Sequence, residues 1–328
     1  MKQILLFFVL LSASFLAAQP PYAGTIFIDP DIITAADPSA IESTTYSREE
    51  VVTMYDRRVN NWVDVNAFLF DVVWDDGLTS RAQVNAEFGD VATATIEAEK
   101  YAFLIGQLPT CLRRDVNEIW IHKGVNAYGG GNNSILIHTG QSALYERDGI
   151  IEETLVHEAS HTSLDADHAS SAGWIDAQRL DDEFISTYAR DNPTREDIAE
   201  SYLTWLMVRY RQDQISIQDF AKITEAIPNR LSYFDDINCD LYPFRTNTSS
   251  AKQAYGLDLK VFPNPASERL QFDGINVSPS AINVFDILGK SVKHLTALEN
   301  GGLNIAQLPQ GTYFLKLEDA VTKFQVKR

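Results

Sequence analysis

The sequence of 328 residues has few cysteines, few basic side chains and, after its first twenty residues, no long hydrophobic run. Its two cysteines exclude a disulfide-dense scaffold and a cysteine-rich zinc module. The 27 Lys and Arg residues are outnumbered by 45 Asp and Glu residues, which gives a net charge of -18. Such an acidic surface repels phosphate backbones, so we expect no nucleic acid among the partners. Because a membrane-spanning helix needs about 20 apolar residues, we also expect no transmembrane segment.

Residues 1–18 have the layout of a secretory signal peptide. Lys2 supplies a short positive start, residues 4–18 are almost entirely apolar, and the small residues Ala17 and Ala18 precede a proline pair. We therefore expect an exported protein that is secreted or held at the cell surface. Export permits a disulfide, so Cys111 and Cys239 are either bonded to each other or buried as two separate thiols.

A change in charge predicts a domain boundary near residue 250. Residues 257–328 contain eight basic and seven acidic side chains, which leaves 19 basic and 38 acidic side chains before them. The polar stretch TNTSSAKQA at residues 246–254 is typical of a linker. We therefore predict a main domain over residues 19–245, a linker over 246–256 and a C-terminal domain over 257–328.

The C-terminal segment alternates short apolar strands with Pro, Gly and Asn, which predicts a small all-β sandwich. VFPNPASERL, VFDILGK and LPQGTYFLKL occur in this order before a closing basic strand. Together they resemble the type A C-terminal sorting domain of the type IX secretion system. The resemblance implies passage through the periplasm and the outer membrane, with the type IX machinery as a partner.

The main domain contains an HExxH pattern on a predicted helix. Residues 150–164 read IIEETLVHEASHTSL, with apolar side chains at helical spacing. His157 and His161 are one turn apart on one face, so both imidazoles can reach one metal ion. Glu158 projects beside them, where it can contact water. The pattern predicts a catalytic Zn²⁺ site, which needs a third protein ligand.

Three candidates for the third ligand follow this helix directly, namely Asp165, Asp167 and His168. Asp167 is ten residues after the first histidine, where another class of zincins has its third ligand. That class also has a glycine where this sequence has Leu164.

Residues 193–207 predict a second helix that is apolar on most sides and therefore buried. Pro193 fits its first turn and Thr194 is a candidate cap. Glu196 and Glu200 lie one turn apart on this helix, and a buried carboxylate is costly unless it is paired or binds metal. An exposed acidic first turn, stabilised by the helix dipole, is the alternative for Glu196.

HEASH, followed about 30 residues later by Tyr-Ala, Asn-Pro and EDIAE, resembles the gluzincin metallopeptidases. The similarity is greatest to the lethal-factor-like and titration-factor-like groups. It implies an α+β zincin-like domain in which a mixed sheet lies above the HExxH helix and a second ligand helix. Carried over to this sequence, the resemblance makes His157, His161 and Glu196 the zinc ligands. It makes Glu158 the general base and Tyr188 the hydrogen-bond donor to the oxyanion. It also makes Asp165 or Glu200 a partner that orients a histidine.

One departure from the family keeps an alternative open. The family places its tyrosine seven residues before the ligand, whereas Tyr188 and Glu196 are eight apart. Glu200 therefore remains an alternative third ligand.

Two further interpretations concern the segment before the HExxH helix. Residues 133–140 (NSILIHTG) predict a rim strand along which an extended peptide adds, with NAYGGGN before it as a flexible loop and His138 at the surface. Residues 19–60 are either a pro-segment or the first part of the fold.

The leading function is a secreted zinc endopeptidase acting on peptides or proteins. The alternatives are a secreted binding or adhesion module that keeps the zincin fold without turnover, and a metal-dependent hydrolase with a substrate other than a peptide.

Overall fold

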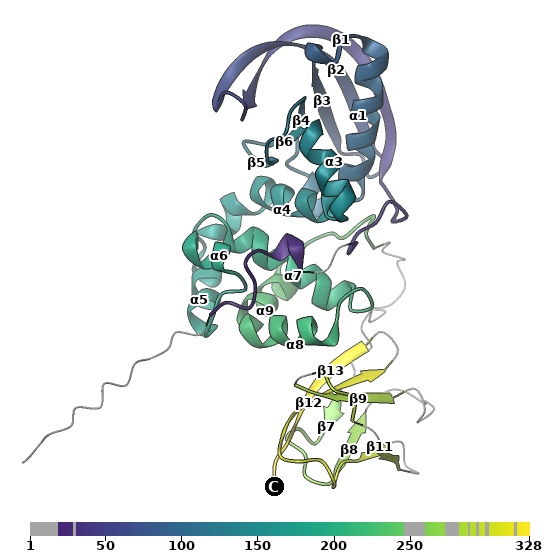
Figure 1. Cartoon of the computed structure of the whole chain (residues 1–328), viewed down its shortest axis with the longest axis vertical. Helices are drawn as coiled ribbons and strands as arrows, with labels where there is room; N and C mark the ends of the chain where they lie inside the picture. The colour runs from purple at the N-terminus through teal and green to yellow at the C-terminus, as the bar shows by residue number, and fades with distance from the viewer. Residues whose placement is uncertain are drawn as a thin grey trace, which may run out of the picture.

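The computed structural model describes residues 19–28, 31–245, 260–272, 282–287, 289–292, 295–298, 302–317 and 320–328. The predicted signal peptide (1–18) and linker (246–256) lie outside the described residues. Figure 1 shows a mixed sheet with helices, followed along the chain by a region built from strands only. This arrangement confirms an α+β main domain followed by a small β domain.

A six-stranded mixed sheet forms one layer of the main domain. Its first three strands pair antiparallel to one another. The next two strands run parallel to the third, and the last strand is antiparallel to its neighbour. The strand order β1-β2-β3-β4-β6-β5 comprises β1 (Ile41–Asp56), β2 (Asn61–Trp74), β3 (Thr79–Asn85), β4 (Glu118–His122), β6 (Ser134–His138) and β5 (Gly129–Gly131).

Both faces of the inner strands are apolar, so the sheet supports two cores. Ile119 and Ile121 of β4 and Ile135 of β6 point into the main core, which the helices cover. Trp120 and Leu136 alternate with them and point to the opposite face, where they form a smaller core with β1 and β2. Buried parallel strands with continuous apolar sequence are expected to pack in this way.

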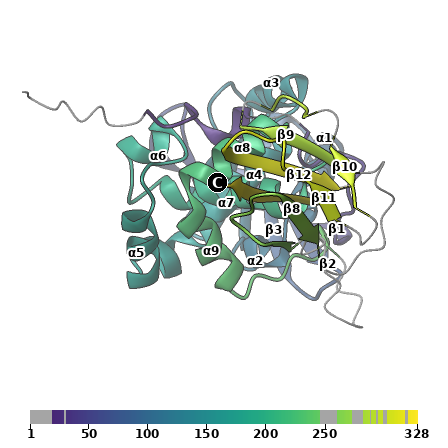
Figure 2. The same ribbon diagram turned by 90° about the horizontal axis from the view of Figure 1, so that it is seen from below.

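The helices cover one face of the sheet and extend beyond its end. In Figure 1, α1 and α3 lie beside the sheet and α5 to α9 lie below it, and Figure 2 places α5 and α6 at the side away from β1 and β2. The helices are α1 (Val91–Gly106), α2 (Thr110–Arg113), α3 (Thr139–Asp148), α4 (Ile151–Ser163), α5 (Ala172–Leu180), α6 (Thr187–Asp191), α7 (Asp197–Tyr210), α8 (Ile217–Ala226) and α9 (Pro228–Asp236).

The first strands form a long hairpin whose tip approaches the opposite edge of the sheet. β1 pairs with β2 along its whole length, and residues 57–60 form the turn between them. The two strands arch across the top of the molecule in Figure 1. The side chain of Arg57 at the tip lies against Gly129 of β5. Of residues 19–60, the segment from Ile41 onward thus forms part of the sheet of the main domain.

Three expectations about local structure were wrong. The NAYGGGN segment, which was expected to be a flexible loop, contains the strand β5. The strand β6, which was expected to be the rim, is therefore an inner strand, and β5 is the rim. The second helix begins at Asp197, so Pro193 and Thr194 lie in the preceding turn, and Thr194 is not its cap. A proline fixes its own backbone, but it does not specify whether a helix starts there or one turn later.

The tail folds as two antiparallel sheets that share one apolar core, including Leu270, Val284 and Phe324. In one sheet the order is β10 (Thr296–Ala297), β11 (Gly302–Asn304), β8 (Arg269–Phe272) and β7 (Val261–Phe262), and in the other it is β13 (Ala320–Val326), β12 (Gly311–Leu317) and β9 (Ile282–Asp286).

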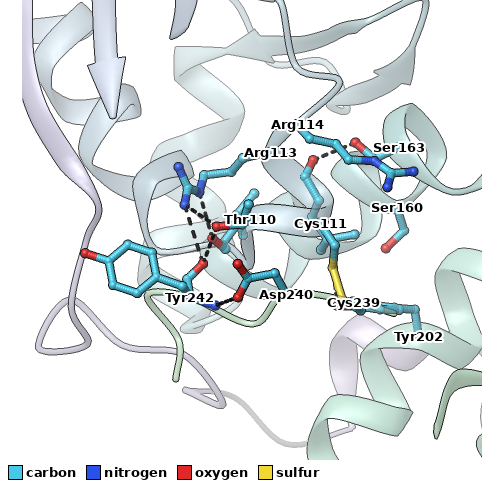
Figure 3. The surroundings of a disulfide bond; sticks show 12 residues. Thr110, Cys111, Arg113, Arg114, Ser160, Ser163, Tyr202, Cys239, Asp240 and Tyr242 are labelled. Carbon is cyan, nitrogen blue, oxygen red and sulfur yellow. Dashed lines mark hydrogen bonds between the residues drawn. A yellow bond between two sulfur atoms is a disulfide. The ribbon is translucent and has the colours of Figure 1, made fainter. Parts of the chain in front are cut away.

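Cys111 and Cys239 form a disulfide, which decides between the two possibilities left open by the sequence. Their Cα atoms are 5.2 Å apart. The bond joins α2 to the segment that follows α9, and Figure 3 shows Tyr202 of α7 beside it. Two backbone hydrogen bonds, from Thr110 to Tyr242 (2.7 Å) and from Cys111 to Asp240 (3.1 Å), hold the same two segments together. The disulfide and the two hydrogen bonds thus attach the segment that follows α9 to α2.

Candidate metal centre

His157 and His161 project from α4 toward the start of α7. Apolar residues of α4 such as Leu155 and Ala159 fill the main core, which fixes the rotation of the helix and leaves the two histidines on its remaining face. Their Nε2 atoms are 3.2 Å apart. This is the i, i+4 placement predicted from the sequence.

Glu196 completes a three-residue cluster with the two histidines. It lies immediately before α7, and its Oε2 is 3.1 Å from Nε2 of His161 and 3.4 Å from Nε2 of His157. One donor atom from each of the three residues lies within 4.8 Å of the others, the only such group of three metal-binding side chains in the part of the chain that the structure describes. Glu196 is 4% exposed, so its expected alternative as an exposed first-turn residue is wrong.

The electrostatics of the cluster favour a cation. Burial raises the pKa of Glu196, but hydrogen bonds with His157 and His161 outweigh it and hold that pKa well below its usual range. Burial lowers the pKa of His161, but its contacts with Asp165 and Glu196 outweigh burial and raise that pKa to about 10. Both shifts arise because carboxylates surround the imidazoles and positive charge is stabilised there.

Each histidine has a carboxylate on its outer side. Asp165 Oδ2 is 2.8 Å from Nδ1 of His161, and Glu200 Oε1 is 3.5 Å from Nδ1 of His157. The contact with Asp165 orients the ring of His161 so that its Nε2 faces the cluster. Glu200 lies too far from Nδ1 of His157 for a hydrogen bond. Glu200 Oε2 accepts a hydrogen bond of 2.9 Å from the backbone N–H of Thr25, so this carboxylate is directed to the N-terminal segment. The structure therefore brings Glu196 into the cluster and leaves Glu200 behind it.

Glu158 and Tyr188 line the same pocket as the cluster. The pocket has a volume of about 270 Å³, and Arg57 and Arg195 also line it. Tyr188, on α6, is 46% exposed. Burial of its hydroxyl and the nearby Glu196 carboxylate raise the pKa of Tyr188 to about 12, so its hydroxyl keeps its proton at neutral pH. A carboxyl group and a hydroxyl group therefore share one cavity with the histidines.

The glycine strand β5 forms the wall of this pocket opposite α6. A Cβ atom on Gly130 would lie 1.8 Å from the backbone oxygen of Glu158, so only glycine allows the strand to approach α4 this closely. The backbone N–H of Gly131 donates a 2.8 Å hydrogen bond to Thr162 Oγ1 of α4. The three consecutive glycines were a usable sign of this close approach. Arg57, about 100 residues from the HExxH pattern, carried no such sign in the sequence.

Other residues singled out in the sequence lie away from the cluster. Asp167 is 3.4 Å from Arg114, and Nδ1 of His168 is 2.6 Å from the hydroxyl of Tyr233. His138 is fully buried, which contradicts its expected place at the surface. It lies on β6 and stacks on His122 of β4 with ring centroids 5.6 Å apart.

Comparison with known proteins identifies only the C-terminal segment. Neither the curated proteins nor the solved structures include a match to this chain. No helix among the described residues is long and apolar enough to cross a membrane. Residues 260–328 match the model of the secretion system C-terminal sorting domain. The predicted type IX partner and the predicted export are thereby confirmed, and the chain ends in a type IX sorting domain that directs it to the cell surface or beyond.

Proposed function

We propose that this protein is a secreted zinc-dependent peptidase whose main domain is a zincin-like α+β fold. The observation that carries the proposal is the convergence of His157, His161 and Glu196 in the pocket that Glu158 and Tyr188 also line. Two of the cluster residues come from α4 and the third from the turn that leads into α7, and the main core packs these two helices together.

The donor set fits zinc. Two imidazole nitrogens and one carboxylate oxygen are a known ligand set of catalytic zinc sites, which keep a further position open. His157, His161 and Glu196 would hold the ion, and Asp165 would orient the ring of His161 through Nδ1. When bound, zinc supplies a Lewis acid that polarises a carbonyl group and makes water more acidic.

The side chains of the pocket provide the remaining parts of amide hydrolysis. Glu158 adjoins His157 and faces the same cavity, where its carboxylate takes a proton from the attacking water and later gives it to the leaving amine. Tyr188 keeps its proton at neutral pH and donates to the carbonyl oxygen as negative charge develops there. Gly130 and Gly131 of the rim strand β5 line the pocket, so an extended peptide that pairs with β5 lies beside it.

Two alternatives predict different behaviour. In a binding or adhesion module, Glu158 has no role beside the metal, so its substitution changes nothing measurable. In a hydrolase with another kind of substrate, Glu158 is needed but proteins are not cleaved.

The test combines zinc content with casein hydrolysis on the chain from residue 19 to 328. We expect one zinc per chain and hydrolysis in the unsubstituted protein. Glu158→Gln should keep the zinc and lose hydrolysis by about 100-fold or more. Glu196→Ala should lose zinc, whereas Glu200→Ala, the matched control one turn along α7, should retain it. A folded protein without zinc would refute the proposal, and zinc without cleavage of any unfolded protein would refute the peptidase assignment.

A further inference from the structure

A second pocket adjoins the candidate metal centre on the other face of β5. It has a volume of about 210 Å³, and the apolar side chains that line it are Tyr55, Trp62, Trp120 and Leu136. We call these four residues the aromatic pocket. It shares Arg57, Gly130 and Gly131 with the pocket of the metal cluster, so the two cavities meet around the strand.

The glycines of β5 face the two pockets alternately. A Cβ atom on Gly130 would point at α4, since it would lie 1.8 Å from the backbone oxygen of Glu158. A Cβ atom on Gly129 would point at the opposite face, where it would lie 3.6 Å from Cβ of Leu136. Because β5 is the last strand of the sheet, a chain paired with it would also direct successive side chains to opposite faces.

The rings of the aromatic pocket are held by one another. Tyr55 and Trp62 are cross-strand partners near the hairpin tip, with ring centroids 5.6 Å apart. Trp62 meets Trp120 of β4 edge to face at 5.3 Å, and Trp120 donates a 2.7 Å hydrogen bond to Glu118. Trp62 nevertheless remains 46% exposed, which is high for a side chain of this size.

We propose that the aromatic pocket is a specificity subsite that accepts a bulky apolar or aromatic side chain of a peptide lying along β5. This inference rests on the proposed function, because it places the peptide beside the metal cluster. The residue of the peptide that points to α4 lies in the pocket of Glu158, and a neighbouring residue points into the aromatic pocket. Successive residues are about 3.4 Å apart along a strand, so a single peptide reaches both cavities.

The chemistry of the aromatic pocket favours an apolar side chain over a sugar. Its rings meet edge to face, and Trp120 is only 4% exposed, so the pocket offers the exposed part of one indole and an aliphatic wall from Leu136. An apolar ring placed there gains both buried area and aromatic contacts. A sugar would need polar partners for its hydroxyl groups, but two of the polar groups that line this pocket already donate within the protein. The hydroxyl of Tyr55 donates to Asn60, and that of Ser134 donates to the backbone oxygen of Gly131.

The experiment measures peptide binding to the Glu158→Gln protein by calorimetry. The probes are blocked octapeptides of alanine in which one phenylalanine is moved through each position. We expect about a tenfold gain in affinity over the all-alanine peptide at one position or at two positions that are two residues apart. Trp62→Ala in the same background should remove this gain while leaving the affinity for the all-alanine peptide unchanged. Tyr46→Ala, an exposed aromatic of the same hairpin far from its tip, is the matched control and should keep the gain.

A phenylalanine gain that survives Trp62→Ala, or no preferred phenylalanine position, would overturn the proposal. Tighter binding of maltohexaose than of any peptide, lost with Trp62→Ala, would also overturn it in favour of a sugar site. If the affinities are too weak for calorimetry, hydrolysis of the same peptides by the unsubstituted chain must show the same preference and its loss with Trp62→Ala. Casein hydrolysis and zinc content test the proposed function separately, so a chain that binds through Trp62 but cleaves nothing would retain the subsite and lose the peptidase.

Discussion

Replacing Arg230 by methionine should destabilise the main domain strongly. The guanidinium of Arg230 on α9 is fully buried between two buried carboxylates, with Nε 2.8 Å from Asp197 and Nη1 2.9 Å from Asp181. Gln178 donates a 2.8 Å hydrogen bond to Asp197, and the guanidinium lies 4.6 Å from the ring of Phe184. Methionine fills a similar volume but leaves both carboxylates buried without a cation.

The expected loss is about 3–5 kcal/mol, since removing one partner of a buried ion pair leaves an uncompensated charge. This is a large part of the roughly 5–15 kcal/mol by which a folded domain is stabilised. Asp197 directly follows Glu196, so loosening the start of α7 should also weaken zinc binding. The network therefore links the packing of α7 and α9 to the position of the cluster.

Urea unfolding followed by tryptophan fluorescence measures this loss. All five tryptophans precede residue 246, so their fluorescence reports on the main domain alone. The matched control is Arg209→Met, because Arg209 also joins α7 to α9, through an ion pair with Asp235 whose side chains are 31% and 39% exposed. The control should lose about 1 kcal/mol or less. Similar losses in the two variants would refute the reasoning from burial.

Two further predictions concern the sheet. Gly130→Ala should destabilise the domain by about 1–3 kcal/mol and reduce casein hydrolysis, because its Cβ atom would overlap the backbone of Glu158. Gly129→Ala should be tolerated, because its Cβ atom would meet the flexible end of Arg57 and lie at an ordinary contact distance from Leu136. Equal urea midpoints for the two variants would contradict this prediction. Burial lowers the pKa of His122 to about 4, while an unfolded histidine titrates near 6.5, so its stabilising contribution is present above about pH 6.5 and is lost as the pH falls toward 4. Between pH 7 and pH 5 the free energy of unfolding, measured with urea, should fall by about 2 kcal/mol because of this group. His122→Gln should lack this part of the pH dependence. If the variant keeps the same pH dependence, another group is responsible. The titratable and charged groups that act on His122 are Asp56, His138, Arg58 and Glu87.

Local pattern was sufficient for the elements that carry the histidines. The apolar spacing of residues 150–164 predicted α4, and the fixed geometry of a helix then placed His157 and His161 on one face. The strand β6 followed from a short apolar run bounded by polar residues and glycine. The sorting domain was also readable, because its motifs occur in a fixed order within about 70 residues.

Long-range placement was not readable in the same way. Helical periodicity did not separate Glu196 from Glu200, since both belong to one predicted buried helix. The family resemblance favoured Glu196, but its spacing to Tyr188 left Glu200 open. The choice came from the N-terminal segment, where the N–H of Thr25 engages Glu200 and leaves Glu196 to face the histidines. A contact between residues 175 positions apart depends on the packing of the whole domain.

The sequence by itself determined the C-terminal sorting domain, the α4 helix and the pairing of two histidines with a glutamate beside them. Each of these depends on residues that are close together in the chain, so helical periodicity or motif order suffices. Only the tertiary structure decided the Cys111–Cys239 bond, the entry of Glu196 into the cluster and the position of β5 between two pockets. These features join segments that are far apart in sequence, and their geometry is fixed by the shared core and by the close backbone contact that Gly130 permits.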